Sequence, residues 1–150
     1  AVEIIDNIVA GSEAQVDVIT VPALIAGTAR IGGVYPVGGQ SIDENGTVRT
    51  INRAFANATG SGNTAVVAAQ GAGVIVRVLS VLVVATLGVT VKFQSATTDI
   101  TAGFPLGANG GMVLPYNPHG WFQTAANEAL NLNLGIATAT GCQITWCQAT

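Results

Sequence analysis

The chain contains very little charge. Only 9% of its 150 residues are Asp, Glu, Lys or Arg, against about 25% in a typical soluble domain. A 15.1 kDa protein exposes about 7,000 Å², so the charges average roughly one per 500 Å². This predicts a neutral or apolar exterior, much of it covered in an oligomer or larger assembly. The alternative is an extracellular β protein with a Thr-, Asn- and Gln-rich surface.

Basic residues are especially few. There are five Lys and Arg residues, scattered along a chain of net charge −3. A nucleic-acid-binding domain normally concentrates basic side chains in a patch or stripe. We therefore expect no nucleic-acid partner.

Histidine and cysteine, the usual carriers of metal and nucleophilic chemistry, are nearly absent. His119 is the single histidine, and Cys142 and Cys147 are the two cysteines. They do not form the paired short spacings of a structural zinc site, and no nucleophile and base can be named for a hydrolase. We therefore expect no enzyme activity, no catalytic residue, no metal and no cofactor.

The cysteine spacing argues against an internal disulfide. In an extended strand Cys142 and Cys147 lie about 16 Å apart and on opposite faces, whereas a disulfide needs Cα atoms within about 7 Å. We expect two reduced thiols, typical of assembly in a reducing cytoplasm. Intermolecular bridging is the alternative.

Convincing helical periodicity is absent beyond the first few residues. Short apolar runs separated by Gly, Asn and Pro recur about every ten residues, a spacing typical of a sandwich or barrel. Leu130, Leu132 and Leu134 alternate with asparagines, and Cys142, Ile144 and Trp146 alternate with polar residues. The predicted fold is all-β: an antiparallel β-sandwich, jelly-roll-like, with an extended N-terminal arm.

The longest apolar run, residues 71–91, has the length of a membrane helix. It contains Arg77 and is dominated by Val and Ile, which favour strands. We interpret it as two strands that turn near Leu87 and Gly88, and expect no membrane partner. The first of them, residues 74–85, is apolar on both faces apart from Arg77 and Ser80. It therefore needs cover from another protein, or from the N-terminal arm folded back over it.

Domain organisation follows from the turns. Asp43 to Gly46 predicts a hairpin turn, and the Gly60 to Asn63 break predicts the start of the compact domain. We therefore expect an arm with a hairpin over residues 1–60 and a sandwich over residues 61–150. The residues predicted to contact other proteins are Ile4, Ile5, Ile8, Val9 and Arg77.

Asn117 to Gly120 has the residues of a type I turn. The turn carries His119 and is flanked by Tyr116 and Trp121. If exposed, these three side chains form a candidate platform for stacking on sugars.

The sequence GGMVLPYNPHGWF, Gly110 to Phe122, and TAANEALNLNL, Thr124 to Leu134, resemble small jelly-roll capsid decoration, or cement, proteins of tailed bacteriophages. The resemblance runs roughly from Asn63 to the C-terminus. It implies a trimer on the outer capsid surface of a virion assembled in the bacterial cytoplasm, and no catalytic residue. Related sandwiches also serve in fibres and tails.

We therefore predict a structural protein that binds the major capsid protein as a homo-oligomer, a trimer by the resemblance, and cements adjacent capsomers. The alternative is a carbohydrate- or receptor-binding module of a phage fibre or an adhesin, which would use Tyr116, His119 and Trp121.

Overall fold

A computed structural model describes residues 40–42 and 48–150, with side-chain burial from residue 48 onward. All of them belong to one compact unit, Tyr35–Thr150, and none of them is helical. The strands are β1 (Gln40–Ile42), β2 (Val48–Ala58), β3 (Gly62–Val67), β4 (Ile75–Ala85), β5 (Val89–Ser95), β6 (Thr98–Asp99), β7 (Phe104–Leu106), β8 (Gly111–Leu114), β9 (Phe122–Gln123), β10 (Leu130–Leu134) and β11 (Thr140–Ala149).

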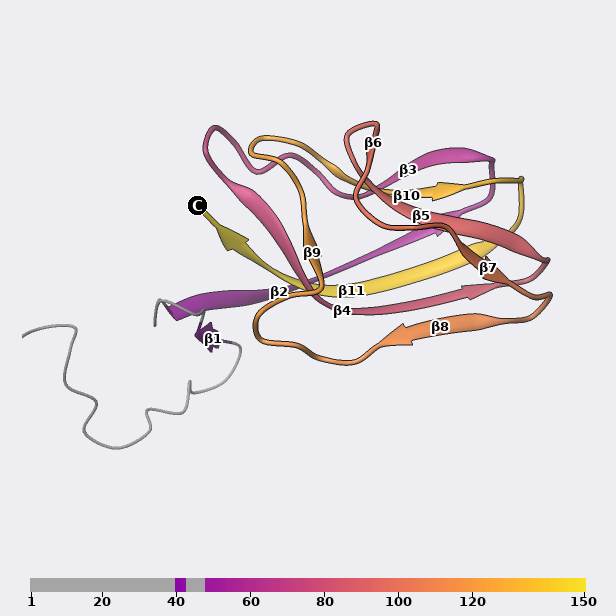
Figure 1. Cartoon of the computed structure of the whole chain (residues 1–150), viewed down its shortest axis with the longest axis horizontal. Coiled ribbons are helices and arrows are strands. Elements are labelled where there is room, and N and C mark those ends of the chain that lie inside the picture. The colour runs from indigo at the N-terminus through magenta and orange to yellow at the C-terminus, as the bar shows by residue number, and fades with distance from the viewer. Residues whose placement is uncertain (1–39, 43–47) are drawn as a thin grey trace, which may run out of the picture. The chain divides into compact units, whose positions relative to one another are not determined.

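The strands form two antiparallel sheets, seen as two layers in Figure 1. One sheet has the order β1-β2-β11-β4-β8, with β9 also paired to β4. The other has the order β3-β10-β5-β6, with β7 also paired to β5. The predicted all-β sandwich is confirmed.

The order of the longer strands is that of a jelly roll. Without the short β1, β6 and β9, the sheets read β2-β11-β4-β8 and β3-β10-β5-β7. Among these eight strands the chain changes sheet at β2 to β3, β3 to β4, β4 to β5, β7 to β8, β8 to β10 and β10 to β11. Eight strands wrapped in this way over two sheets define the fold.

The core lies between the sheets and is almost wholly aliphatic. The inward residues of β10, the leucines at 130, 132 and 134, are at most 2% exposed. From β5 comes Phe93, which is fully buried and packs against Phe122 with ring centroids 4.9 Å apart. The apolar residues that alternate with polar ones in the sequence of β10 are therefore the residues that point into the core, as predicted.

The apolar run at residues 71–91 is two strands, as predicted. β4 ends at Ala85 and β5 begins at Val89, so the chain turns through Leu87 and Gly88. Within residues 40–42 and 48–150 there is no helix of the length and apolarity needed to cross a membrane.

The compact domain begins before Gly60 to Asn63, where the sequence predicted its start, so that prediction is wrong. β2 is a full member of the first sheet and pairs with β11 from Ile51↔Cys147 to Ala58↔Thr140. Its inward residues include the alanines at 54, 56 and 58, whose small side chains give a weak hydrophobic pattern. Residues 59–61 form the passage from one sheet to the other, and Gly62 at the start of β3 has φ of 86°.

The two strands of the predicted hairpin are present. β1 pairs antiparallel with β2 in the register Ile42↔Val48. The turn residues between them, and the arm at residues 1–39, lie outside the described residues.

Candidate functional site

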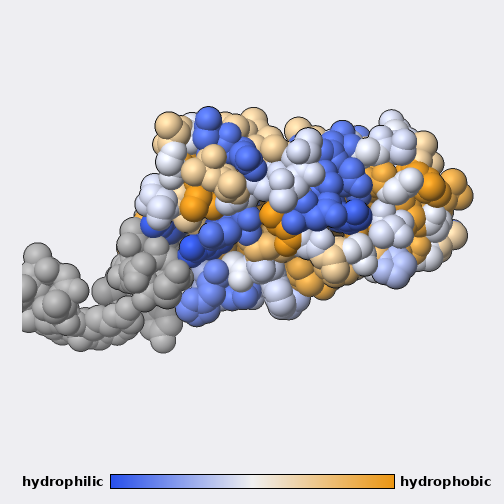
Figure 2. Space-filling model, turned by 45° about the horizontal axis from the view of Figure 1, so that its top comes forward, coloured by the Kyte–Doolittle hydropathy of each residue, from blue (hydrophilic) through white to orange (hydrophobic). Residues whose placement is uncertain are grey.

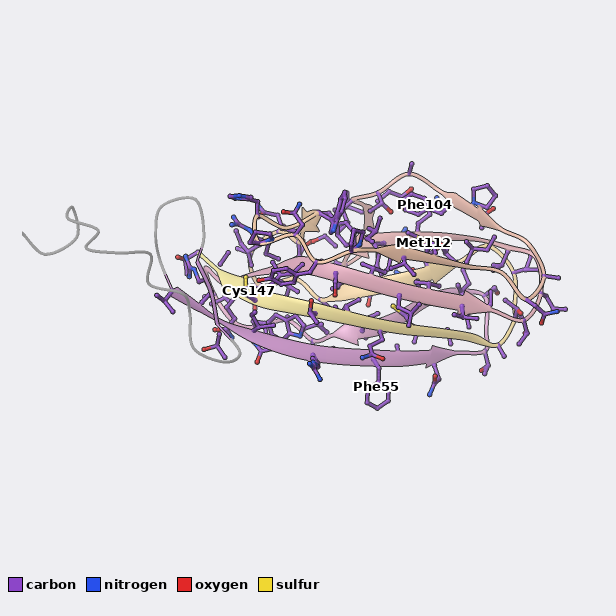
Figure 3. All side chains as sticks on the ribbon, turned by 90° about the horizontal axis from the view of Figure 1, so that it is seen from below. Phe55, Phe104, Met112 and Cys147 are labelled. Carbon is purple, nitrogen blue, oxygen red and sulfur yellow. The ribbon has the colours of Figure 1, made fainter. Side chains whose placement is uncertain are left out.

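The outer face of the first sheet carries a row of exposed apolar side chains. Phe55 on β2, Leu82 on β4 and Val113 on β8 are 76%, 43% and 66% exposed. They lie at one level, because Gln143 on β11 is opposite both Phe55 and Leu82, and Leu82 is opposite Val113. Directly opposed residues of an antiparallel sheet point to the same side. Figure 3 shows Phe55 projecting away from its strand.

The next level of the same face adds a fourth apolar side chain. Val84 is 50% exposed and lies between Gly141 of β11 and Gly111 of β8. A Cβ on Gly111 would come within 2.5 Å of the Val83 carbonyl oxygen, so that position admits no side chain. We call Phe55, Leu82, Val84 and Val113 the apolar face.

As predicted for residues 74–85, β4 carries apolar side chains on its outer side as well as in the core, and the cover over them stays a prediction. Leu82 and Val84 point away from the core and are about half exposed in the described structure. The outward aromatic of β2, Phe55, was missed because β2 was assigned to the arm. The signal was present, since Arg53, Phe55 and Asn57 alternate with alanines.

The described charged side chains on the first sheet's outer face are all positive. Arg53 lies opposite Thr145, and Arg77 lies opposite Cys147, in the levels below the apolar face. Alternation along β2 places Arg49 on the same side. No described acidic residue lies on this face.

The outer face of the second sheet is polar instead. The Lys92 ammonium contacts the Asp99 carboxylate at 2.8 Å, and Gln94 also donates to Asp99. The hydrogen bond from Lys92, followed by that from Gln94, lowers the pKa of Asp99. Asn133 donates to Asn63 across the neighbouring strands. Figure 2 shows a large hydrophilic patch over this upper part of the molecule.

A second apolar area lies at the end of the sandwich where β4 turns into β5. Leu87 and Ile136 are 55% and 49% exposed. Beside them is a shallow hollow of about 370 Å³ lined without charged residues: Gly88, Val89, Thr90, Pro105, Leu106, Gly135 and Ile136. Hydrophobic residues gather at the right-hand end of Figure 2. We call Leu87 and Ile136 with this hollow the apolar tip.

The loop between β8 and β9 holds the three candidate stacking residues. Tyr116 and Trp121 are 51% and 45% exposed, and His119 is exposed. The predicted turn is confirmed, because the Gly120 amide donates to the Asn117 carbonyl at 3.0 Å. Asn117 Oδ1 also accepts from the His119 amide.

Hydrogen bonds to β4 fix this loop in place. The Asn117 and Trp121 amides donate to the carbonyls of Leu79 and Val78, each at 2.8 Å. The Trp121 indole donates to the Pro115 carbonyl at 2.7 Å. Gly120 has φ of 83°, and a Cβ there would approach Arg77 Cγ to 2.6 Å.

The structure brings together residues that the sequence assigned to different roles. His119, Trp121 and Arg77 line one shallow hollow of about 230 Å³, together with Gly120, Phe122 and Gln123. Arg77 Nε donates to Gln123 Oε1 at 3.2 Å. Tyr116 does not line the hollow. The other predicted contact residues, Ile4, Ile5, Ile8 and Val9, lie outside the described residues.

Both cysteines are buried and neither forms a disulfide. Cys142 points into the core, where burial raises the pKa of its thiol to about 12. Cys147 lies on the opposite side of β11, at a level where β4 and β11 shift register. Among the described residues, no three His, Cys, Asp or Glu side chains are grouped as a metal ion would need.

No protein-family model, no curated protein and no solved structure matches this chain. We therefore infer its function from the physical character of its surfaces.

Proposed function

We propose that this chain is a structural protein of a tailed-phage virion, of the capsid decoration type. It forms a homo-oligomer, a trimer by the resemblance in its sequence, on the outside of the capsid. There it binds the major capsid protein and cements adjacent capsomers. Its role is binding, not catalysis.

The observation that carries this proposal is the apolar face. On this outer sheet surface Leu82, Val84 and Val113 lie together, and Phe55 lies across the exposed Gln143 from Leu82. Contiguous exposed apolar surface on a protein marks an interaction site. The opposite outer face, with its Lys92–Asp99 ion pair, is suited to water. A sandwich with one dry and one wet outer face is expected to be covered on the dry side.

The apolar tip supplies a second contact surface. Leu87 and Ile136 are about half exposed beside a hollow with uncharged walls. A homo-oligomer that uses the apolar face for itself presents several copies of the tip together. Several weak contacts from one assembly bind far more tightly than one contact alone. We assign the tip to the capsid surface.

The fold is compatible with this role but does not decide it. Jelly rolls occur in viral capsid proteins, and also in lectin domains and cupins. Function has to be argued from sites on such a fold.

The test is to mix the purified protein with tailed-phage capsids that lack it. We expect saturable binding and a gain in capsid resistance to heat and to low salt. Absence of both would contradict the proposal.

One observation favours a carbohydrate-binding module as a second candidate. His119 and Trp121 line a hollow with Arg77 and Gln123, so an exposed aromatic face lies beside hydrogen-bonding groups. Sugars are recognised by such pairs of stacking and polar contacts. The loop is held by β4 and needs no rearrangement to bind.

A glycan array separates the two candidates. Binding that is lost in a Trp121→Ala variant, and kept in a Tyr116→Ala variant outside the hollow, would favour the carbohydrate module. No glycan bound by the wild type would leave the capsid role as the better account.

A further inference from the structure

The first sheet's outer face has a chemistry that restricts what can cover it. Its apolar side chains come from β2, β4 and β8, with Gln143 of β11 between Phe55 and Leu82, and its described charged residues are arginines. If two copies met through this face by a twofold axis along the strands, the arginines of one copy would oppose those of the other. Like charges brought together in an interface repel and disfavour that contact. The face therefore calls for an occupant that is both apolar and acidic.

Arg53 supplies the clearest charge on this face. It is exposed, lies two residues before Phe55 on the same side of β2, and makes no ion pair with any described residue. A carboxylate placed beside it would meet a single positive charge next to apolar surface.

The chain itself contains an apolar and acidic segment, at residues 1–17. It contains none of the five basic residues of the chain. It does contain four of the eight acidic residues, namely Glu3, Asp6, Glu13 and Asp17. Between the first acids lie Ile4, Ile5, Ile8 and Val9, the residues predicted from sequence to contact other proteins. From residue 45 onward the balance reverses, with four basic and two acidic residues.

Chain length allows the arm to reach a neighbouring copy. From β1, which lies beside β2 at Thr50, the level of Phe55 is five residues along β2, or about 17 Å. The 22 residues from 18 to 39 can span up to about 75 Å. This tether is several times longer than the chain's own face requires, and long enough to reach the next molecule.

We propose that residues 1–17 of one copy bind the apolar face and Arg53 of a neighbouring copy. The isoleucines cover Phe55, Leu82, Val84 and Val113, while the acids meet Arg53. Such a contact joins unlike surfaces, so it closes into a ring when its rotation allows. The proposal takes from the proposed function only that the chain self-associates.

Two full-length variants test it by complementation. A face variant, Arg53→Glu with Phe55→Ser, keeps the arm. An arm variant, Ile4→Ser and Ile5→Ser with Asp6→Lys, keeps the face. Tyr116→Ser, on the loop between β8 and β9, is the matched control for loss of an exposed hydrophobic side chain. The masses of each variant, and of an equal mixture of the two, are measured by light scattering, with thermal unfolding as the check that each is folded.

We expect the wild type and the control to be oligomers and each variant to have the 15.1 kDa mass of one chain. The mixture should form a dimer, because one arm and one face remain functional. A mixture that stays monomeric overturns the exchange between copies. Variants that keep the wild-type mass overturn the docking of the arm but leave self-association, and hence the proposed function, intact. A monomeric wild type overturns the inference, while capsid binding is judged separately by the capsid assay.

Discussion

At the residue scale, Cys142 shows most directly how burial controls chemistry in this protein. Its side chain is in the core and its thiol pKa is raised to about 12, because burial disfavours the thiolate. Only the thiolate reacts readily with alkylating reagents. At pH 8 we expect the Cys142 thiol to resist iodoacetamide in the native protein and to react fully in denaturant, as read by mass spectrometry of its peptide. Rapid native labelling would contradict its placement.

The same pKa shift predicts how stability depends on pH. Above pH 9.0, the ordinary pKa of the thiol, the unfolded chain loses the proton while the folded chain keeps it until about pH 12. The unfolded state then binds fewer protons, so the free energy of unfolding decreases as pH rises through this window. Chemical denaturation between pH 8 and 11 should show a smaller decrease in a Cys142→Ala variant than in the wild type. Equal slopes would exclude the thiol as the cause.

Gly120 is a second residue with a specific requirement. Its φ of 83°, and the 2.6 Å approach of a Cβ to Arg77 Cγ, make any side chain unfavourable. Gly120→Ala should lower the free energy of unfolding by about 1–3 kcal/mol. Gly107→Ala is the matched control, because a Cβ there meets nothing within 4 Å. Denaturant titration of both variants measures the difference, and equal stabilities would contradict the strain.

At the element scale, β2 decides where the folded domain begins. It covers β11 over the register from Ile51 to Ala58 and brings Ala56 and Ala58 into the core. A chain that begins at residue 61 should lose cooperative unfolding, because β11 becomes an edge and the core is opened. A chain that begins at Tyr35 should keep it. Near-UV circular dichroism and urea titration report the result, and a cooperative transition from residue 61 would show β2 to be dispensable.

The elements predicted correctly from sequence are those whose period is unambiguous. Apolar and polar residues alternate without interruption in Leu130 to Leu134 and in Cys142 to Trp146. Asn117 to Gly120 has residues that a type I turn prefers. β2 was assigned to the arm because its buried residues are alanines, which resemble a polar or flexible segment in a hydrophobic pattern. Its pairing with β11 joins residues about 90 positions apart, and no local feature reports such a contact.

The candidate surfaces likewise combine features that local sequence predicts with features that depend on long-range strand pairing. Alternation revealed that β4 is apolar on both faces, and Leu82 and Val84 are outward as that implied. The alignment of Phe55 with Leu82 and Val113 depends on the order β2-β11-β4-β8, which arises only when the jelly roll closes. The meeting of Arg77 with His119 and Trp121 likewise depends on β9 pairing with β4.

At the scale of the whole molecule, the two apolar areas predict separable effects. Replacing Leu87 and Ile136 together by Ser should weaken binding to capsids and leave the mass of the oligomer unchanged, because the tip is distinct from the apolar face. Tyr116→Ser, at the loop between β8 and β9, is the control for loss of an exposed hydrophobic side chain. Capsid cosedimentation with light scattering tests this. Unchanged capsid binding would show that the tip is not the contact.

The distribution of charge along the chain supports this separation. Acidic residues are concentrated before residue 45, while the described arginines lie on the outer face of one sheet and the Lys92–Asp99 ion pair lies on the other. A molecule with one wet face, one apolar face and an oppositely charged segment is suited to ordered association. Such association should weaken with added salt where its charged contacts are exposed.

If the face formed by Phe55, Leu82, Val84 and Val113 is an interface, charges placed on it should separate the copies. Sedimentation velocity compares the wild-type chain with a Leu82→Lys, Val113→Lys variant over a hundredfold range of concentration. We expect a defined multiple of 15.1 kDa for the wild type and a single folded chain for the variant. A wild type that remains monomeric at the highest concentration would contradict it.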